Sequence, residues 1–301
     1  MAPLTPSSRT PLVTPWSDFW HAVRAYPVPL AGGHSRHLYA ALPHGKGARA
    51  KIVYDVACAY GGPQNGHVAF AAAVEAIHAA SLCHDDILDN GNMRRGQRCI
   101  HRTHGVRHAI LLGDALMAAA FRIIDTVNAP GLTPCMAQCV SYLVEGQLTE
   151  YTLHRQSSPY DCIRTAYLKT GCLFGSAAKG SGLIANAPPL TARTLYRRGC
   201  RAGVAFQLHD DCNEYTSPPD QWTTAHDIIQ GQWTLPLIHA CRTPHIDHAV
   251  RHVQRDITNE KAKQRLVRLM GPSIASVRHL ARRYDQCAHH GMPAPSNLTI
   301  Q

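Results

Sequence analysis

The feature that most constrains this chain is an apolar, alanine-rich stretch that ends in closely spaced aspartates. Residues 68–82 are mostly apolar, which is typical of a buried helix. His78, Asp85 and Asp89 are spaced by seven and four residues, so they share one face of that helix. Two carboxylates one turn apart repel each other and resist burial, and a bound divalent cation would relieve both effects. Oxygen ligands favour Mg²⁺, which completes its shell with water and substrate phosphates.

A basic loop follows this helix. Arg94 and Arg95 precede Gly96, and two guanidinium groups close to a carboxylate-held metal suit a polyphosphate ligand. The alternative interpretation is an acidic helix end followed by a solvated basic loop, and one acidic motif alone does not exclude it.

A second acidic segment weighs against that alternative. Asp210 and Glu214 lie one turn apart after another apolar stretch, and Gln207 and Asp211 fall on the same stripe as Glu214. Two acidic helix faces looking at each other across a cavity would hold a metal cluster between them.

These two motifs and their flanks resemble the trans-isoprenyl diphosphate synthases, the polyprenyl synthetase family, over about residues 45–240. Residues 78–96 match that family's first aspartate-rich motif, and residues 206–211 match the second. Residues 45–50 resemble its Gly-Lys-Arg-x-Arg-Pro loop, but Gly47 and Ala50 replace an arginine and a proline. Gln232 stands where the family has a lysine, so this chain lacks two basic groups of the pattern.

The resemblance implies a role for each matching residue. The residues implied in catalysis are Asp85, Asp89, Lys169, Thr170, Gln207 and Asp210. Those implied in substrate binding are Lys46, Arg49, His78, Arg94 and Arg95. Those implied in metal binding are Asp85, Asp86, Asp89, Asp210, Asp211 and Glu214, with three Mg²⁺ ions as the expected cofactors.

The resemblance also implies an all-α, single-domain isoprenoid synthase fold, with roughly a dozen helices around a deep apolar cavity. We expect that domain over residues 16–291, with a disordered tail at 1–15 and a loose tail at 292–301. Helical spacing predicts two short helices within residues 16–41, broken at 27–33. It also predicts a long helix over 160–184 that is interrupted at 169–171.

The composition indicates which classes of partner and which cellular location to expect. The formal charge is +10, but no basic run or aromatic-interleaved patch occurs, which disfavours a nucleic-acid partner. Anionic small substrates explain part of the arginine content, and solvated helix faces explain most of it. The sequence has no run of about 18 apolar residues, so we expect no membrane span. The first residues lack the apolar run of a signal peptide, so we expect a cytoplasmic protein whose eleven cysteines are reduced.

The expected reaction is head-to-tail prenyl transfer, in which isopentenyl diphosphate is condensed with dimethylallyl, geranyl or farnesyl diphosphate. Ala80 and Ser81 are small residues just before Asp85, where farnesyl-forming members of the family usually have an aromatic residue, so the resemblance implies a product longer than C15. The short chain of 301 residues favours geranylgeranyl diphosphate (C20), with Ile77 and Val74 as the floor of the cavity. Alternatives are a farnesyl or longer-chain synthase, a non-catalytic partner subunit of a prenyl synthase, and a class I terpene cyclase. Relatives are usually homodimers, so we expect a homodimer.

Overall fold

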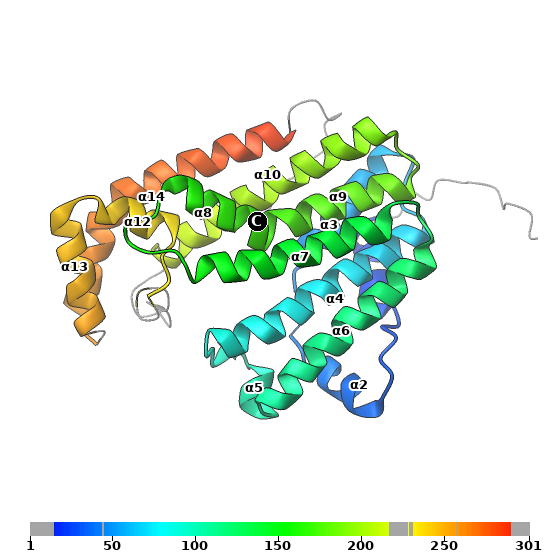
Figure 1. Ribbon diagram of the computed structural model, residues 1–301, viewed down its shortest axis with the longest axis horizontal. Helices are drawn as coiled ribbons and strands as arrows, with labels where there is room; N and C mark the ends of the chain where they lie inside the picture. Colours follow the sequence, from blue (N-terminus) through cyan, green and yellow to red (C-terminus); the bar gives the residue numbers. More distant parts are fainter. Residues whose placement is uncertain (1–14, 44, 217–227, 229–230, 257, 290–301) are drawn as a thin grey trace, which may run out of the picture. The chain divides into compact units, whose positions relative to one another are not determined.

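The computed structural model describes residues 15–43, 45–216, 228, 231–256 and 258–289. The fold is all-α, as the sequence predicts (Figure 1). Nearly all of both predicted tails lies outside the described residues. The described residues separate into two compact units: those within 15–133 and 180–192 form unit 1, and those within 134–179 and 193–289 form unit 2.

The first half of the chain contains six helices and one hairpin among its described residues. They are α1 (Trp16–Ala25), α2 (Gly33–Ala40), α3 (Ala48–Ala59), α4 (Asn65–Leu88), β1 (Met93–Arg94), β2 (Gln97–Arg98), α5 (Ile100–Thr103) and α6 (Val106–Val127). The predicted break at 27–33 is confirmed, because α1 and α2 flank it. The two-residue strands were not predicted.

The central helix of unit 1 is α4, which lies alongside α6 over much of its length (Figure 1). Small and aliphatic side chains of the two helices form one core cluster that includes Ala80, Cys83, Leu112 and Leu116. Among the described helices, α4 alone has the length and composition of a possible membrane span, and 61% of its apolar window is buried within the protein. Its apolar character is therefore used largely for packing.

The rest of the chain is also helical. Its elements are α7 (Leu132–Glu150), α8 (Pro159–Ala166), the π-helix η1 (Tyr167–Gly171), α9 (Cys172–Ile184), α10 (Pro189–Glu214), α12 (Leu235–Cys241), α13 (Pro244–Arg255) and α14 (Glu260–His289). The interruption predicted at 169–171 is confirmed as the π-helical turn η1.

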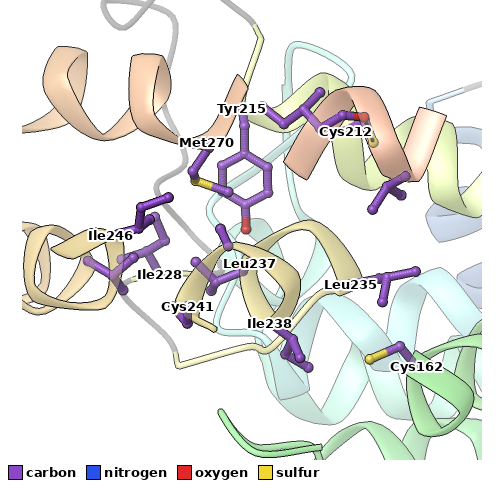
Figure 2. Packing of buried hydrophobic residues seen from close by; sticks show 14 of the residues in the cluster. Cys162, Cys212, Tyr215, Ile228, Leu235, Leu237, Ile238, Cys241, Ile246 and Met270 are labelled. Carbon is purple, nitrogen blue, oxygen red and sulfur yellow. Dashed lines mark hydrogen bonds between the residues drawn. The ribbon is translucent and has the colours of Figure 1, made fainter. Parts of the chain in front are cut away.

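The core of unit 2 is formed mainly by α10, α12, α13 and α14 (Figure 2). Tyr215 lies at the C-terminal end of α10 with only 2% of its surface exposed, among Leu237, Ile246 and Met270. Its hydroxyl is 3.0 Å from Oγ1 of Thr234, which precedes α12. This buried aromatic ring therefore fixes the end of the helix that carries the second acidic motif.

Candidate active site

The first acidic motif occupies the last turns of α4. Asp85 lies in the final turn, and Asp89 is the C-cap residue whose backbone N–H donates to the carbonyl of Asp85. Both side chains are partly exposed, whereas Asp86 between them is buried. The structure therefore keeps Asp85 and Asp89 accessible and turns Asp86 inward.

Asp86 is held by Arg94. The guanidinium of Arg94 donates from Nε and Nη2 to Asp86 Oδ1, each at 2.6 Å. Such paired, charge-assisted contacts are strong and directional. Asp86 was predicted as a metal ligand and Arg94 as a phosphate ligand, and in this structure each is engaged with the other. Both roles stay predictions that require this ion pair to rearrange.

Arg95 is positioned by a tight turn between β1 and β2. Arg95 and Gly96 are the two central residues of the hairpin turn, and both have positive φ, 52° and 77°. Positive φ at both positions is what a two-residue hairpin turn of type I′ requires. The Arg95 side chain donates from Nη1 to the carbonyl of Pro43 at 3.1 Å and lies against Gly45. The basic loop is therefore a short hairpin that holds its second arginine against Pro43 and Gly45.

These elements enclose a pocket of about 90 Å³ in unit 1, which we call the arginine pocket. Its lining includes Arg24, Gly45, Glu75, His78, Arg94, Arg95 and Arg98. Of the predicted substrate-binding residues, His78, Arg94 and Arg95 lie on its wall. Lys46 is exposed on the adjoining loop, and Arg49 lies in the first turn of α3.

Glu75 connects the pocket to α3, and it was not predicted as a site residue. Its Oε1 accepts the backbone N–H of Ala50 at 3.0 Å, so the carboxylate caps the N-terminus of α3. Burial raises the pKa of Glu75, while the nearby charge of Arg49 opposes that shift. The sequence did contain a sign of this role, because Glu75 is a charged residue one turn before His78 in an otherwise apolar run.

The surroundings of His78 favour a neutral imidazole. Burial lowers the pKa of His78 well below its usual value, and the positive charges of Arg49, Arg95 and Arg94 lower it further. A neutral imidazole donates one hydrogen bond and accepts another, so His78 is suited to a polar contact rather than to charge pairing with an anion.

The loop position where the family pattern has an arginine is closed. Gly47 is the N-cap of α3 with φ 69°, and a Cβ built there would lie 2.7–2.9 Å from ring atoms of Trp20. Gly47→Arg is the substitution that would restore the arginine of the family pattern. It does not fit this structure, because the Trp20 ring occupies the space that the new side chain would enter.

The second acidic motif lies at the C-terminal end of α10. A hydrogen-bond chain joins three predicted residues: Thr170 Oγ1 donates to Gln207 Oε1 at 2.7 Å, and Gln207 Nε2 donates to Asp211 Oδ1 at 2.8 Å. Asp210 is exposed, whereas Asp211 and Glu214 are partly buried. The structure thus brings η1 and α10 together at the residues that the sequence singles out.

Lys169 lies in the same π-helical turn, and its ammonium group contacts Glu150 Oε2 at 2.5 Å. The close approach of α7 to this turn depends on Gly146, where a Cβ would lie 2.5 Å from the backbone nitrogen of Lys169. A half-buried ammonium group requires an anionic partner, and here a carboxylate of the protein itself supplies it.

The carboxylates of the two acidic motifs fit a Mg²⁺ ion whose remaining ligands are phosphate oxygens and water. Among the residues described, no three His, Cys, Asp or Glu side chains form a ready-made metal cage. Mg²⁺ is typically bound through one or two carboxylates together with substrate phosphates and water. The accessible pair Asp85 and Asp89 on α4, and the exposed Asp210 on α10, supply oxygen ligands of that kind.

Similar proteins were found by sequence and by structure. The polyprenyl synthetase family model matches residues 35–270. The octaprenyl diphosphate synthase of Escherichia coli is 34% identical over 202 residues, covering 65% of this chain and 62% of that protein. The nonaprenyl diphosphate synthase of Mycobacterium tuberculosis is 30% identical over 256 residues, covering 81% of this chain and 76% of that protein.

Among solved structures, a polyprenyl synthase from Caulobacter crescentus, complexed with calcium and isoprenyl diphosphate, is 26% identical with a TM-score of 0.78. That match covers 90% of this chain and 86% of the other. The chain spans about three fifths of the length of the Escherichia coli relative. The family model, however, covers well over half of this chain and includes both acidic motifs, so the protein belongs to the polyprenyl synthetase family.

Proposed function

We propose that this protein is a Mg²⁺-dependent prenyltransferase that condenses isopentenyl diphosphate with an allylic diphosphate. The observation that carries the proposal is the placement of a basic pocket and an acidic, cation-binding motif along one helix. His78 on the wall of the arginine pocket and Asp85 in the acidic motif are seven residues apart on α4. That spacing is about 10 Å along the helix axis. The helix α4 therefore contributes one wall of the basic pocket and, further along, the carboxylates suited to a metal-bound second diphosphate.

Each residue has a defined role in this proposal. Arg95 binds the diphosphate of isopentenyl diphosphate together with Lys46 and Arg49, and the neutral His78 contributes a hydrogen bond. Asp85 and Asp89 orient the allylic substrate through its metal-bound diphosphate. When bound, Mg²⁺ supplies charge stabilisation for the departing diphosphate.

The second motif supports the same chemistry in unit 2. We propose that Asp210 is a metal ligand and that Lys169 exchanges Glu150 for a phosphate oxygen. Thr170 and Gln207 present oxygens suited to stabilising an allylic cation, and their mutual hydrogen bond orients them. The released diphosphate accepts the proton that the condensation leaves on the new chain.

The product is proposed to be longer than C15. Ser81 lies on the same face of α4 as His78 and Asp85, and its hydroxyl donates to the carbonyl of His78 at 2.9 Å. A side chain this small does not block a growing chain at that level. The sequence favours C20, whereas the relatives named octaprenyl, nonaprenyl and decaprenyl diphosphate synthase favour a longer product. Sizing the product distinguishes these two lengths.

A homodimer and a cytoplasmic location stay predictions. Light scattering of the purified protein tests the first, because a homodimer has twice the chain mass of 32.9 kDa. Microscopy of a tagged chain in its native host tests the second.

The test of the proposed chemistry compares carboxylate variants. Asp85→Asn and Asp210→Asn should each lower turnover by on the order of 100-fold, as loss of one element of preorganised charge stabilisation does. Asp125→Asn is the control, because Asp125 is exposed on α6 outside both motifs. If Asp85→Asn or Asp210→Asn folds normally and retains wild-type turnover, the proposed use of these carboxylates is wrong.

A further inference from the structure

The arginine pocket has more positive charge than its predicted residues supply. Four arginines and two carboxylates line it, so positive charge exceeds negative charge by two. One carboxylate, Asp86, is already paired with Arg94. Arg24 and Arg98 are the lining arginines that the sequence did not single out, and both are exposed. Within the described part of the chain, no ion pair joins either of them to a carboxylate.

Arg24 reaches this pocket because α1 is firmly anchored. Phe19 and Val23 are buried, and the rings of Trp16 and Phe19 pack against Tyr54 of α3. Trp20 and Arg24 are four residues apart on α1, so they share one face of the helix, and both line the pocket. The position of Arg24 is therefore set by the packing of α1 rather than by a flexible loop.

The same face of α1 closes the loop position at Gly47. The Trp20 ring occupies the space beside Gly47 and excludes a side chain there. One helical turn further along, Arg24 presents a guanidinium to the pocket that contains Gly45 and Arg95. A single helix thus prevents a basic side chain on the loop and places another basic side chain at the pocket.

We propose that Arg24 binds a phosphate oxygen of isopentenyl diphosphate and supplies the positive charge that the loop cannot carry at Gly47. This inference rests on the proposed function, because it assigns isopentenyl diphosphate to the arginine pocket. A guanidinium is suited to the role because it remains charged and can donate two parallel hydrogen bonds to phosphate.

The test measures affinity for each substrate separately. Arg24→Ala should raise the Kd for isopentenyl diphosphate about 10-fold by calorimetry, the size expected for one partly solvated charge-assisted contact. The Kd for farnesyl diphosphate, measured in the same way, should stay within about twofold, and Arg24→Lys should recover part of the lost affinity for isopentenyl diphosphate. Arg107→Ala is the control, because Arg107 is exposed at the start of α6 and does not line the pocket.

The possible results separate this inference from the proposed function. Unchanged affinity in Arg24→Ala, in a protein whose wild-type form binds and condenses isopentenyl diphosphate, would overturn only the inference. An equal rise in the constants for isopentenyl and farnesyl diphosphate in Arg24→Ala would mean a general structural role and would also overturn the inference. A loss of affinity for isopentenyl diphosphate in Arg98→Ala but not in Arg24→Ala would overturn it as well. Wild-type protein that binds no isopentenyl diphosphate would remove the proposed function as well.

Discussion

The closed position at Gly47 gives a prediction whose size follows from the structure. Gly47→Ala has two costs. A side chain at φ 69° lies in the left-handed region, at about 1–2 kcal/mol, and its Cβ would overlap Trp20, at about 1–3 kcal/mol for overpacking. A combined cost of about 3 kcal/mol lowers the Tm of a 301-residue protein by about 5 °C. Gly47→Arg should be at least as destabilising and should not improve the KM for isopentenyl diphosphate.

Thermal unfolding of matched variants separates the two costs. Gly231 has nearly the same φ, 68°, but nothing lies within 4 Å of a Cβ built there. Gly231→Ala should therefore show the backbone cost alone. In a Trp20→Ala background, Gly47→Ala should lose the overlap cost, which a double-mutant cycle measures as coupling. Equal costs at Gly47 and Gly231, zero coupling, or a stable Gly47→Arg protein with a lower KM would refute this reasoning.

Three further predictions concern other positions. Burial lowers the pKa of His67, so as the pH falls the unfolded chain binds a proton before the folded protein does. The contribution of His67 to stability should therefore be complete above about pH 6.5 and should decline below it. His67→Gln should flatten that decline, which urea unfolding at pH 7.5 and 5.5 measures. Ser81→Phe should shift the product towards C15, whereas Ala80→Phe should mainly lower stability, because Ala80 is fully buried in the core cluster shared with α6. Gly146→Ala should lower both Tm and turnover, because its Cβ would overlap the backbone at Lys169.

Each of these predictions has a contradicting result. An unchanged pH dependence in His67→Gln would remove the assigned role of that imidazole. A folded Ser81→Phe protein with the wild-type product would contradict the choice of this position as a length gate. For Gly146, Gly32→Ala is the control, because nothing lies within 4 Å of its Cβ, and equal effects in the two variants would contradict the packing argument.

The sequence predicted those structural features that depend on the spacing of residues close together in the chain. Apolar periodicity placed α4, and the Lys169-Thr170-Gly171 interruption marked the π-helical turn. The spacing of Gln207 and Asp211, four residues apart on one helix, correctly predicted that they share a face, and the structure joins their side chains.

The sequence was insufficient where the signal depends on contacts distant along the chain. Trp20 and Gly47 are 27 residues apart, and only their packing shows that the loop position is closed. The sequence analysis treated Ala80 and Ser81 alike, whereas the structure shows Ala80 buried in the α4–α6 core cluster and leaves Ser81 partly exposed on the face with Asp85. The capping of α3 by Glu75 also required knowledge of how two helices pack.

The most direct test of the proposed function is the incubation of wild-type protein with Mg²⁺, isopentenyl diphosphate and each allylic primer, followed by mass analysis of the products. We predict prenyl diphosphates of C20 or longer, each extended by whole five-carbon units, and no product when the metal is chelated. Diphosphate release with hydrocarbon products and no incorporation of isopentenyl diphosphate would indicate a terpene cyclase and contradict the proposal. Incorporation that requires an added second subunit, or no incorporation at all, would contradict it equally.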